Sequence, residues 1–522
     1  MNILRSAALV SFFTIVSRIS GYARDILIAR IAGTGFFADV FFAAFKMTNL
    51  LRKVLIDGSF FAAFVPSFSK IKEKYGKDEA LIFSSKMLSI ALYIVLAITI
   101  IANIFMPQVT KFMAPGFTGE KLALTISLSY IIFWYFIFIC LISIISGVLN
   151  GIHKFSYYAI VPIFMNISMI FFTLFLQDYF ENIGYCLAWA VVFGGLVQFL
   201  FIYLACVYEK FVVKIQLPSK KLFDENTKSA YKKMLPSIIG GSLSQINTMV
   251  DLVLGSMIAS GVSYLYYTDR IFFLPTSVIG TAISIVILPL ISKQIAQGKM
   301  DSANQLVGEA ISLSTIMVLP AAFVLLLNSS MLTSVTFEGG AFTSSDVNVV
   351  STMLQILAVA LPFCVFNKIA SAIFFSHSDT KTPMYITLAS VLINVGISIF
   401  LMQLGFGVFG ITIGTAISYF LSCVISVIIL MKRKLLVIGM DIAKFVAKVA
   451  ISSGTSALLM QWCVMHKTFG YYAIIHDANL LTKLTYMLVT VGITGLAFLL
   501  LSRFLGVNIL HILFTRKHNQ PL

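Results

Sequence analysis

Charged residues are scarce in this sequence. Asp, Glu, Lys and Arg make up only 11% of the 522 residues, whereas soluble domains carry about 25%. The polar segments between the apolar runs are short, so they leave no room for a separate nucleotide-binding or glycosyltransferase domain. These shortages exclude a secreted protein, a single-pass receptor and a large aqueous enzyme.

Residues that build metal and redox centres are also few. The six cysteines form no CxxC pair and lie almost entirely within apolar runs, which is typical of small buried side chains. The six histidines are scattered through loops and tails without an HExxH sequence, and there is no Walker A motif. We therefore expect no catalytic residue, no metal site and no bound cofactor.

Apolar residues are abundant instead, at 59% of the chain. A run of about 20 such residues can span a bilayer as a helix. The first run carries Arg18, Arg24 and Arg30, so it lacks the clean core of a cleavable signal peptide and is predicted to remain as a span. Fourteen runs are found, at about 6–33, 36–66, 82–107, 122–150, 156–177, 183–207, 234–258, 262–292, 305–327, 347–375, 383–403, 406–431, 443–465 and 480–504. The predicted fold class is an all-α polytopic membrane protein with about 14 transmembrane helices.

The net charge of +16 has a strong pattern along the chain. Loops after even-numbered runs contain eighteen Lys and Arg residues, whereas loops after odd-numbered runs contain four. Because positive loops stay on the cytoplasmic side, both termini are predicted to be cytoplasmic. The longest linker, about 207–233, is predicted to lie on the membrane surface as an amphipathic helix.

The sequence also repeats itself. Residues 17–35 align with 243–261 at an offset of 226, which places Asp25 on Asp251. Asn166 aligns with Asn394 at an offset of 228. A unit of six spans predicts two pseudo-symmetric six-helix lobes in parallel repeat, followed by two C-terminal helices. The expected organisation is an N-lobe at 1–208, a cytoplasmic amphipathic linker at 209–233, a C-lobe at 234–431, and the last two spans with the tail at 432–522.

The first two runs concentrate charge at membrane depth, where each charge costs at least about 2.5–3.5 kcal/mol on insertion scales. Structural ion pairs between helices would nearly balance, and they are the alternative for these residues. The excess of cations favours a chamber between the two bundles for an anion, and arginine matches phosphate with a planar fork. The six cations are Arg18, Arg24, Arg30, Lys46, Arg52 and Lys53, and the three carboxylates are Asp25, Asp39 and Asp57.

Glycines accompany these charges. Gly21 lies between Arg18 and Arg24, and Gly58 follows Asp57. Interrupted helices at membrane depth usually line a cavity, so we expect a mobile or broken first span. Glycine for close helix packing is the alternative at each position.

Several segments together resemble one known family. SRISGYARD at 17–25 and the long block ADVFFAAFKMTNLLRKVLIDGSFFAAFVPSFS are followed by APGF at 114–117, YYTDR at 266–270 and SDTKTP at 378–383. This set resembles the lipid II flippase family (the MurJ/MviN proteins) of the MOP exporter superfamily, from residue 1 to at least the twelfth span. The resemblance implies alternating access of two lobes in the bacterial inner membrane, with export of the undecaprenyl-pyrophosphate-linked peptidoglycan precursor, lipid II. It also implies a groove for the lipid tail at the last two spans.

The resemblance, by motif position, and the charge pattern together assign expected roles to residues of this chain. The expected substrate-binding residues are Arg18, Arg24, Arg52, Arg270, Asn49 and Lys46. The expected gating or ion-pair residues are Asp25, Asp39, Asp57 and Asp269, with Asp25 and Asp39 pairing with arginines when substrate is absent. One departure lies at Ile271–Phe272–Phe273, where family members often carry a polar residue, and it puts a polar substrate contact at 272–273 in doubt.

The interpretation as a lipid II flippase also raises the questions of which energy source drives transport and which partners the protein has. Asp251 has no basic neighbour in its own span and is the candidate site for a coupling cation or proton, and membrane potential is the other candidate driving force. The expected partners are lipid II and membrane lipids, with the cell-wall synthesis machinery as a further candidate. We expect a functional monomer and no nucleic acid.

Rival interpretations belong to two classes. Another MOP-type exporter of lipid-linked oligosaccharides would share the cationic hairpin, whereas an exporter of organic cations would need an acidic cavity. An integral membrane glycosyltransferase or polymerase would need catalytic carboxylates or a metal site at the membrane edge. Growth of a host whose own lipid II flippase has been replaced would distinguish them.

Overall fold

The computed structural model describes residues 3–55, 59–219, 222–436, 440–465 and 480–509. These residues are almost entirely helical, and among them the only strand-like pairing is an isolated bridge between Gly339 and Phe342. The predicted all-α fold is therefore confirmed. Asp57 falls in the gap at 56–58, outside the described residues.

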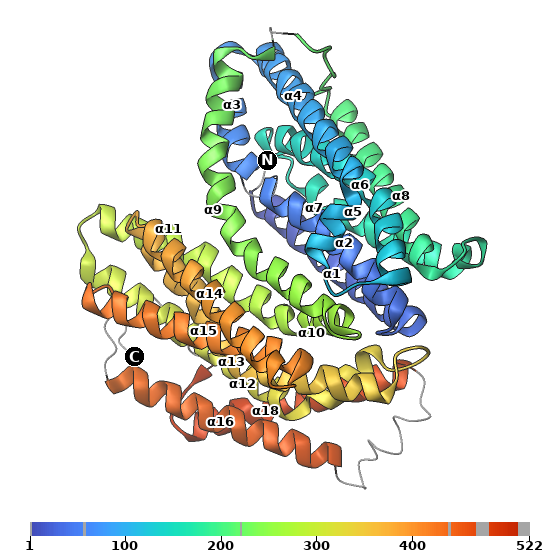
Figure 1. Cartoon of the computed structure of the whole chain (residues 1–522). Coiled ribbons are helices and arrows are strands. Elements are labelled where there is room, and N and C mark those ends of the chain that lie inside the picture. Colours follow the sequence, from blue (N-terminus) through green and yellow to red (C-terminus); the bar gives the residue numbers. More distant parts are fainter. Residues whose placement is uncertain (1–2, 56–58, 220–221, 437–439, 466–479, 510–522) are drawn as a thin grey trace. The chain divides into compact units, whose positions relative to one another are not determined.

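The helices pack into two units, and the first comprises Met1–Ser263 and Gly339–Phe342. In this unit α6 packs against α2, α3, α4 and α8, while α7 packs against α1 and α8. The α6 helix is the most enclosed, with Phe133, Phe136 and Ile142 fully buried. The helices of the unit, blue to green in Figure 1, are α1 (Ile3–Ala32), α2 (Phe36–Leu55), α3 (Ser59–Tyr75), α4 (Lys77–Ile104), α5 (Met106–Met113), α6 (Gly119–Gly151), α7 (Ser156–Phe171), α8 (Ile183–Tyr208) and α9 (Glu225–Ser256).

The second unit comprises Tyr264–Glu338 and Thr343–Leu522. In it α12 packs along α13, and both α13 and α14 pack on α15. The α16 helix packs against both α12 and α18. Its helices are α10 (Gly261–Pro275), α11 (Ala282–Ala296), α12 (Met300–Phe337), α13 (Ser344–Ser376), α14 (Lys381–Gln403), α15 (Gly407–Lys432), α16 (Met440–Met465) and α18 (Leu480–Phe504).

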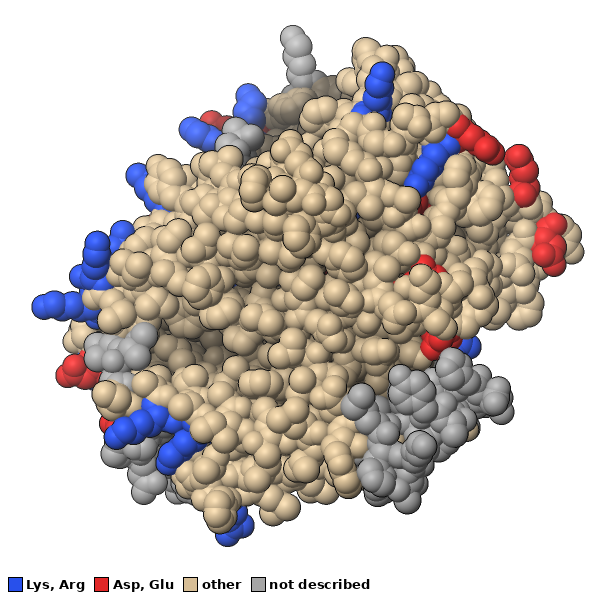
Figure 2. All heavy atoms as spheres, turned by 60° about the horizontal axis from the view of Figure 1, so that its bottom comes forward, with Lys and Arg blue, Asp and Glu red and all other residues tan. Residues whose placement is uncertain are grey.

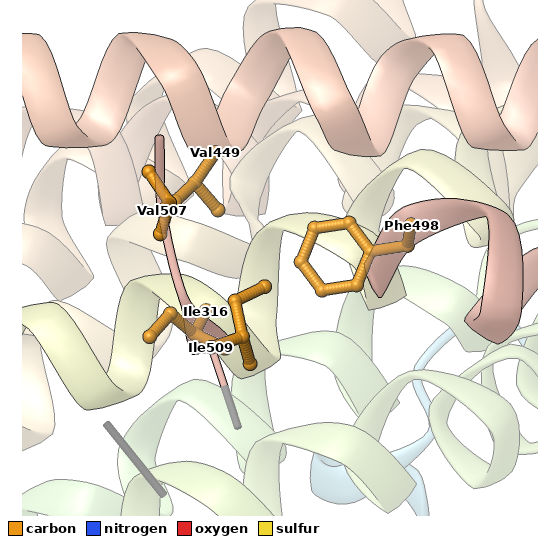
Figure 3. Close-up of a cluster of buried hydrophobic side chains, with 5 residues drawn as sticks. All are labelled: Ile316, Val449, Phe498, Val507 and Ile509. Atoms are coloured by element: carbon orange, nitrogen blue, oxygen red, sulfur yellow. The ribbon is translucent and has the colours of Figure 1, made fainter. Parts of the chain in front are cut away.

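An apolar cluster fixes the last two helices to the rest of the second unit. Ile316 of α12, Val449 of α16 and Phe498 of α18 are buried together (Figure 3). Val507 and Ile509, from the segment that follows α18, complete the cluster. In a bilayer such a contact is stabilised by close packing rather than by exclusion of water.

Where the structure describes them, all fourteen predicted apolar runs lie on helices, but not every run qualifies as a span. Eleven helical segments are long and apolar enough to cross a membrane within the described part of the chain. The runs without such a segment lie on α1, on α2 and α3, and on α9, which carry charged or polar residues. Fourteen spans therefore stay a prediction. On the face drawn in Figure 2, charged side chains occupy only scattered patches of a mostly uncharged surface, as a lipid-facing protein requires.

The internal repeat is visible in the backbone itself. Residues with positive φ are uncommon outside glycine, yet they recur in pairs 221 to 227 residues apart. His153 (φ 62) corresponds to Ser378 (φ 61), and Lys210 (φ 59) corresponds to Lys434 (φ 57). The other pairs are Gly33 with Ser260, Gly76 with Gly298, and Gly119 with Gly340. Left-handed backbone positions therefore recur at or near helix ends at similar spacing in both halves of the sequence.

Each half also contains an ion pair next to these turns. The acidic and basic residues of the pair are exchanged between the two halves. Nζ of Lys154, before α7, lies 2.8 Å from Oε1 of Glu209 at the end of α8. Oδ2 of Asp379, before α14, lies 2.5 Å from Nη1 of Arg433 at the end of α15. Burial by itself raises the pKa of Asp379, but hydrogen bonds from Thr382 and Arg433 outweigh it and hold that pKa well below its usual range. The pair therefore adds stability at neutral pH that is lost as the pH falls through that lowered pKa.

The linker between the halves departs from the predicted amphipathic helix. Residues 211–217 have no helical or other regular structure, and the α9 helix begins only at Glu225. The backbone N–H of Lys214 donates to Ser85 Oγ at 3.1 Å, and that of Gln216 donates to Ser89 Oγ at 2.8 Å. These serines lie one turn apart on α4 and bind amide groups that a helix would have used internally. The helix prediction was wrong before residue 225 because a neighbouring helix supplies the acceptors.

The α9 helix also changes the expected grouping. The repeat predicts that the second lobe begins after residue 233, but α9 packs against α2 and α3 of the first unit. The packing boundary consequently lies at Ser263. The repeat describes how the sequence is organised, whereas packing depends on which helices touch, so the predicted lobe boundaries stay a prediction.

Gly21 does not interrupt the first helix, contrary to expectation. The α1 helix is continuous from Ile3 to Ala32. A Cβ on Gly21 would lie 3.4 Å from Nδ2 of Asn166, so the missing side chain lets α1 approach α7 closely. Gly33, with φ +60, does end the helix. The sequence did not predict the distortions that are present, which are π-helical turns at Phe172–Leu176 and Thr276–Thr281 and a non-helical Asn328 inside α12.

Candidate functional site

Arg24 and Asp25 form a buried ion pair on α1, with 7% and 2% of their surface exposed. Nε and Nη2 of Arg24 donate to the same carboxylate oxygen, Oδ1 of Asp25, at 3.0 and 2.7 Å. A buried charge is tolerated when it is paired and hydrogen-bonded. Asp25 thus pairs with an arginine, as its expected gating role requires, and the pair carries no net charge.

Asn166 of α7 also binds Arg24. Its Oδ1 accepts a hydrogen bond from Nη1 of Arg24 at 2.9 Å. Its Nδ2 donates to the Ser17 carbonyl at 3.1 Å and to the Ser20 hydroxyl at 3.0 Å. The sequence showed Asn166 only as a marker of the repeat, and its one functional signal was an amide in the middle of an apolar run.

The other predicted cations of the first unit are less enclosed. Arg18 is exposed, while Lys46 and Arg52 are half-buried. Nε of Arg52 donates to Oδ1 of Asn49 at 3.3 Å, and Nδ2 of Asn49 donates to the Phe45 carbonyl at 2.9 Å. Residues three apart on a helix share a face, so α2 brings the predicted neighbours Asn49 and Arg52 together.

Asp39 is fully buried and pairs with a lysine rather than with an arginine. Nζ of Lys121, in the first turn of α6, lies 2.6 Å from Oδ2 of Asp39. Oδ1 accepts from the backbone N–H of Ser263 at 2.8 Å and from its hydroxyl at 2.7 Å. The expected arginine partner was wrong, because folding brings the start of α6, counted as a loop in the sequence, beside the start of α2. A carboxylate at the first turn of α10 is also favoured by that helix's dipole.

The APGF segment holds the corner between α9 and α10 from a second side. The N–H of Gly116 donates to Ser256 Oγ at 3.1 Å. A Cβ on Gly116 would lie 2.3 Å from the Ser256 carbonyl oxygen, so only glycine fits against this backbone. Nζ of Lys121 lies 4.3 Å from the ring centre of Phe117, which links this segment to the Asp39 network.

We expect Gly116→Ala to loosen this corner, because the new Cβ meets main-chain atoms that cannot rotate away. Amide hydrogen exchange of residues 254–263 should rise about tenfold or more, as overpacking typically costs about 1–3 kcal/mol. Gly35→Ala is the matched control, since a Cβ there has nothing within 4 Å. Equal exchange in both variants would contradict the close-contact argument.

The second unit contributes Arg270, Asp269 and Lys368. Nη2 of Arg270 donates to the Tyr266 hydroxyl at 2.6 Å, and the guanidinium stacks 4.7 Å from the centre of that ring. Asp269, which precedes Arg270 in the sequence, is half-buried. Nζ of Lys368 donates to Oγ1 of Thr281 at 3.0 Å, in the π-helical turn. The sequence did not predict Tyr266 or Thr281 as partners.

The burial of two further positions singled out in the sequence differs. Phe272 is 1% exposed, so this part of the departing segment belongs to the core, while Phe273 is 43% exposed. Asp251 is half-buried on α9. The predicted site residues that the structure describes therefore divide between the units, with Arg270 and Asp269 in the second and the others in the first.

Comparison with known proteins identifies the family. A sequence model described as "Lipid II flippase MurJ" matches residues 28–503, which is most of the chain. The chain belongs to the lipid II flippase MurJ family. Its members are transporters, so the chain is a membrane transporter rather than an enzyme. The predicted family is confirmed.

Relatives within the lipid II flippase MurJ family align over nearly the whole chain. A probable lipid II flippase MurJ of Rhizobium tropici is 34% identical over 87% of this chain and 85% of its own length. One of Buchnera aphidicola subsp. Acyrthosiphon pisum is 30% identical over 98% of this chain and 99% of its own.

Solved structures show the same fold. A lipid II flippase MurJ in an inward closed conformation superposes with a TM-score of 0.76, at 25% identity, covering 95% of this chain and 99% of that one. An inward-facing multidrug resistance MATE transporter of the MOP superfamily reaches a TM-score of 0.65 at 16% identity, covering 82% and 98%. That second likeness shows the fold alone.

Proposed function

We propose that this protein moves lipid II, the undecaprenyl-pyrophosphate-linked peptidoglycan precursor, from the cytoplasmic to the periplasmic leaflet of the bacterial inner membrane. The observation that carries the proposal is the match of residues 28–503 to the lipid II flippase MurJ family. The guanidinium and ammonium groups of the first helices support it, because they suit a substrate that carries phosphate.

The proposed binding chemistry is electrostatic. Passage of a diphosphate and a sugar-peptide through hydrocarbon without partners is prohibitive, so a cationic cavity supplies counter-charges and water. The polyprenyl tail stays in the lipid, and no covalent step is needed. The residues proposed to contact the pyrophosphate or the groups beside it are Arg18, Arg24, Arg52, Arg270, Asn49 and Lys46.

Alternating access needs interactions that exist in one conformation and break in the other. The Arg24–Asp25 pair and the Asp39–Lys121–Ser263 network are suited to that use. Both are buried, so they strongly favour the state in which they form. We propose that substrate binding releases Asp25, and that the Asp39 network separates when the opposite side of the membrane opens.

Purified protein in liposomes tests the proposal directly. Labelled lipid II placed in one leaflet should become accessible to a reagent on the other side faster than in empty liposomes. Growth of a bacterium whose own lipid II flippase has been replaced by this chain is the matching test in cells. Transport of undecaprenyl-linked oligosaccharides instead of lipid II would favour another MOP-type exporter, and formation of a new glycosidic bond would favour a membrane glycosyltransferase.

We propose that Asp251 binds the coupling cation or proton. A half-buried carboxylate on a helix of the first unit is suited to take up a small cation. Asp251→Asn should remove the dependence of lipid II transport on the ion gradient while binding of lipid II persists. Asp301→Asn is the control, because Asp301 is exposed at the start of α12. Unchanged ion dependence in Asp251→Asn would contradict this assignment and leave membrane potential as the driving force.

The membrane topology and partners complete the proposal. The excess of Lys and Arg in even-numbered loops supports cytoplasmic termini. We propose that the protein acts as a monomer, surrounded by membrane lipids, and that it meets the cell-wall synthesis machinery where lipid II is consumed.

A further inference from the structure

We propose that Asn166 is a positioning residue that holds the Arg24 guanidinium in place while a substrate phosphate takes over from Asp25. The inference rests on the proposed function, because the phosphate belongs to the lipid-linked substrate. It assigns unequal roles to two side chains that bind Arg24 in the structure, Asp25 and Asn166. Asp25 is the exchangeable partner, and Asn166 is the permanent one.

The contacts of Arg24 support this division. Two of its nitrogens, Nε and Nη2, donate to a single oxygen of Asp25, and Nη1 donates to Asn166. The edge formed by Nε and Nη2 is the edge with which arginine binds carboxylates or phosphates in a forked arrangement. A phosphate that replaces Asp25 on this edge would leave the bond to Asn166 unchanged.

The orientation of the Asn166 amide is determined by its other partner. The Ser17 carbonyl can only accept a hydrogen bond, so the NH₂ group of Asn166 must face it. The amide oxygen is then the atom that faces Arg24. The Ser20 hydroxyl, which is a turn away from Arg24 on α1, accepts a second bond from the same NH₂ group. The α1 helix thereby orients the acceptor that holds its own arginine.

Close packing of the two helices makes the arrangement rigid. Asn166 is 5% exposed, and Gly21 faces it from α1 between Ser20 and Arg24. A side chain at position 21 would enter the space beside the amide, since its Cβ would already lie 3.4 Å from Nδ2. Gly21, which was expected to break α1, is in this view the residue that lets the amide reach the helix.

The chemical type of the residue matters because an amide accepts a hydrogen bond without carrying charge. A neutral acceptor holds the guanidinium and leaves its positive charge available to a phosphate. A carboxylate at position 166 would give Arg24 two anionic partners and would repel an approaching phosphate. The number of carboxylates around Arg24, rather than the hydrogen bond alone, is therefore expected to set substrate affinity.

Three variants of the full-length protein separate positioning from a merely structural role. N166D adds one carboxylate beside Arg24, and D25N/N166D returns the number to that of the wild type. N348D is the matched control, because Asn348 is exposed on α13 and gains the same charge. Equilibrium binding of lipid II and of undecaprenyl pyrophosphate is measured in detergent, with thermal unfolding to confirm that each variant is folded.

We expect N166D to weaken binding of both lipids by about tenfold or more, a change of about 1.4 kcal/mol, and D25N/N166D to recover most of that loss. N348D should bind like the wild type. The loss in N166D should be the same for both lipids, because the pyrophosphate is their common part.

Each other outcome has a definite meaning. Wild-type affinity in N166D overturns the positioning role of Asn166. A loss of affinity in N166D that D25N/N166D does not recover overturns it too, since that result indicates that Asn166 only holds α1 and α7 together. Wild-type protein that binds neither lipid overturns the proposed function and this inference together. Failure of the two proposals is therefore distinguishable.

Discussion

Arg24→Ala is expected to abolish lipid II transport. The change removes the guanidinium proposed to bind the pyrophosphate and leaves the buried Asp25 carboxylate without the partner seen in the structure. Hydrogen bonds to charged groups are worth about 1.5–3 kcal/mol, so affinity for the lipid pyrophosphate should fall about tenfold to a hundredfold. Transport in liposomes and growth in the replacement strain are the measurements.

The loss of Arg24 from Asp25 needs its own control, because breaking a buried pair costs about 3–5 kcal/mol, which is enough to unfold the protein. Arg24→Ala/Asp25→Ala removes both charges and should regain thermal stability without regaining transport. Arg503→Ala removes an exposed guanidinium from the last turn of α18 and should transport normally. Transport by the folded double variant would show that Arg24 does not bind the substrate.

Asp39→Leu is expected to release the start of α10. The variant leaves the Lys121 ammonium without its carboxylate and removes the acceptor of the Ser263 N–H. Loss of one partner from a buried pair costs about 3–5 kcal/mol, so exchange of the Ser263 amide should accelerate at least about a hundredfold. Hydrogen exchange followed by mass spectrometry reads this amide without dependence on substrate.

A double substitution separates the effect of the Asp39–Lys121 ion pair from that of the hydrogen bond between Asp39 and the Ser263 N–H. Asp39→Leu/Lys121→Met also removes the uncompensated ammonium and should recover global stability, while the Ser263 amide still exchanges fast because its acceptor is absent. Asp39→Asn keeps an acceptor oxygen and should protect the amide better than leucine. Slow exchange in all three variants would show that Asp39 does not hold this corner.

Residues predicted for the site contact one another where they lie close in sequence. Arg24 with Asp25 and Asn49 with Arg52 are separated by one to three residues, so helical geometry alone brings them together. Asp39 with Lys121, Arg24 with Asn166 and Lys368 with Thr281 are separated by 82 to 142 residues. Periodicity along one helix contains no information about such pairs.

Local backbone features show the same limit. Gly33 ends α1, because a positive φ at a helix end depends mainly on the residue itself. Gly21 was misjudged, since a glycine inside a helix serves either a break or a close contact, and only the neighbour decides. The linker at 211–217 was misjudged for a related reason, because serines of α4 supply the hydrogen-bond acceptors.

The sequence by itself determined the membrane class, the family, the internal repeat and the excess of cations in the first helices. These properties depend on composition, on order along the chain and on helical spacing, which folding does not alter. Only the tertiary structure decided that Asp39 binds Lys121 and Ser263, that α9 packs with the first unit, and that Asn166 accepts a hydrogen bond from Arg24. The physical reason is that a buried polar group must find a partner, and packing between distant segments determines which partner is within reach.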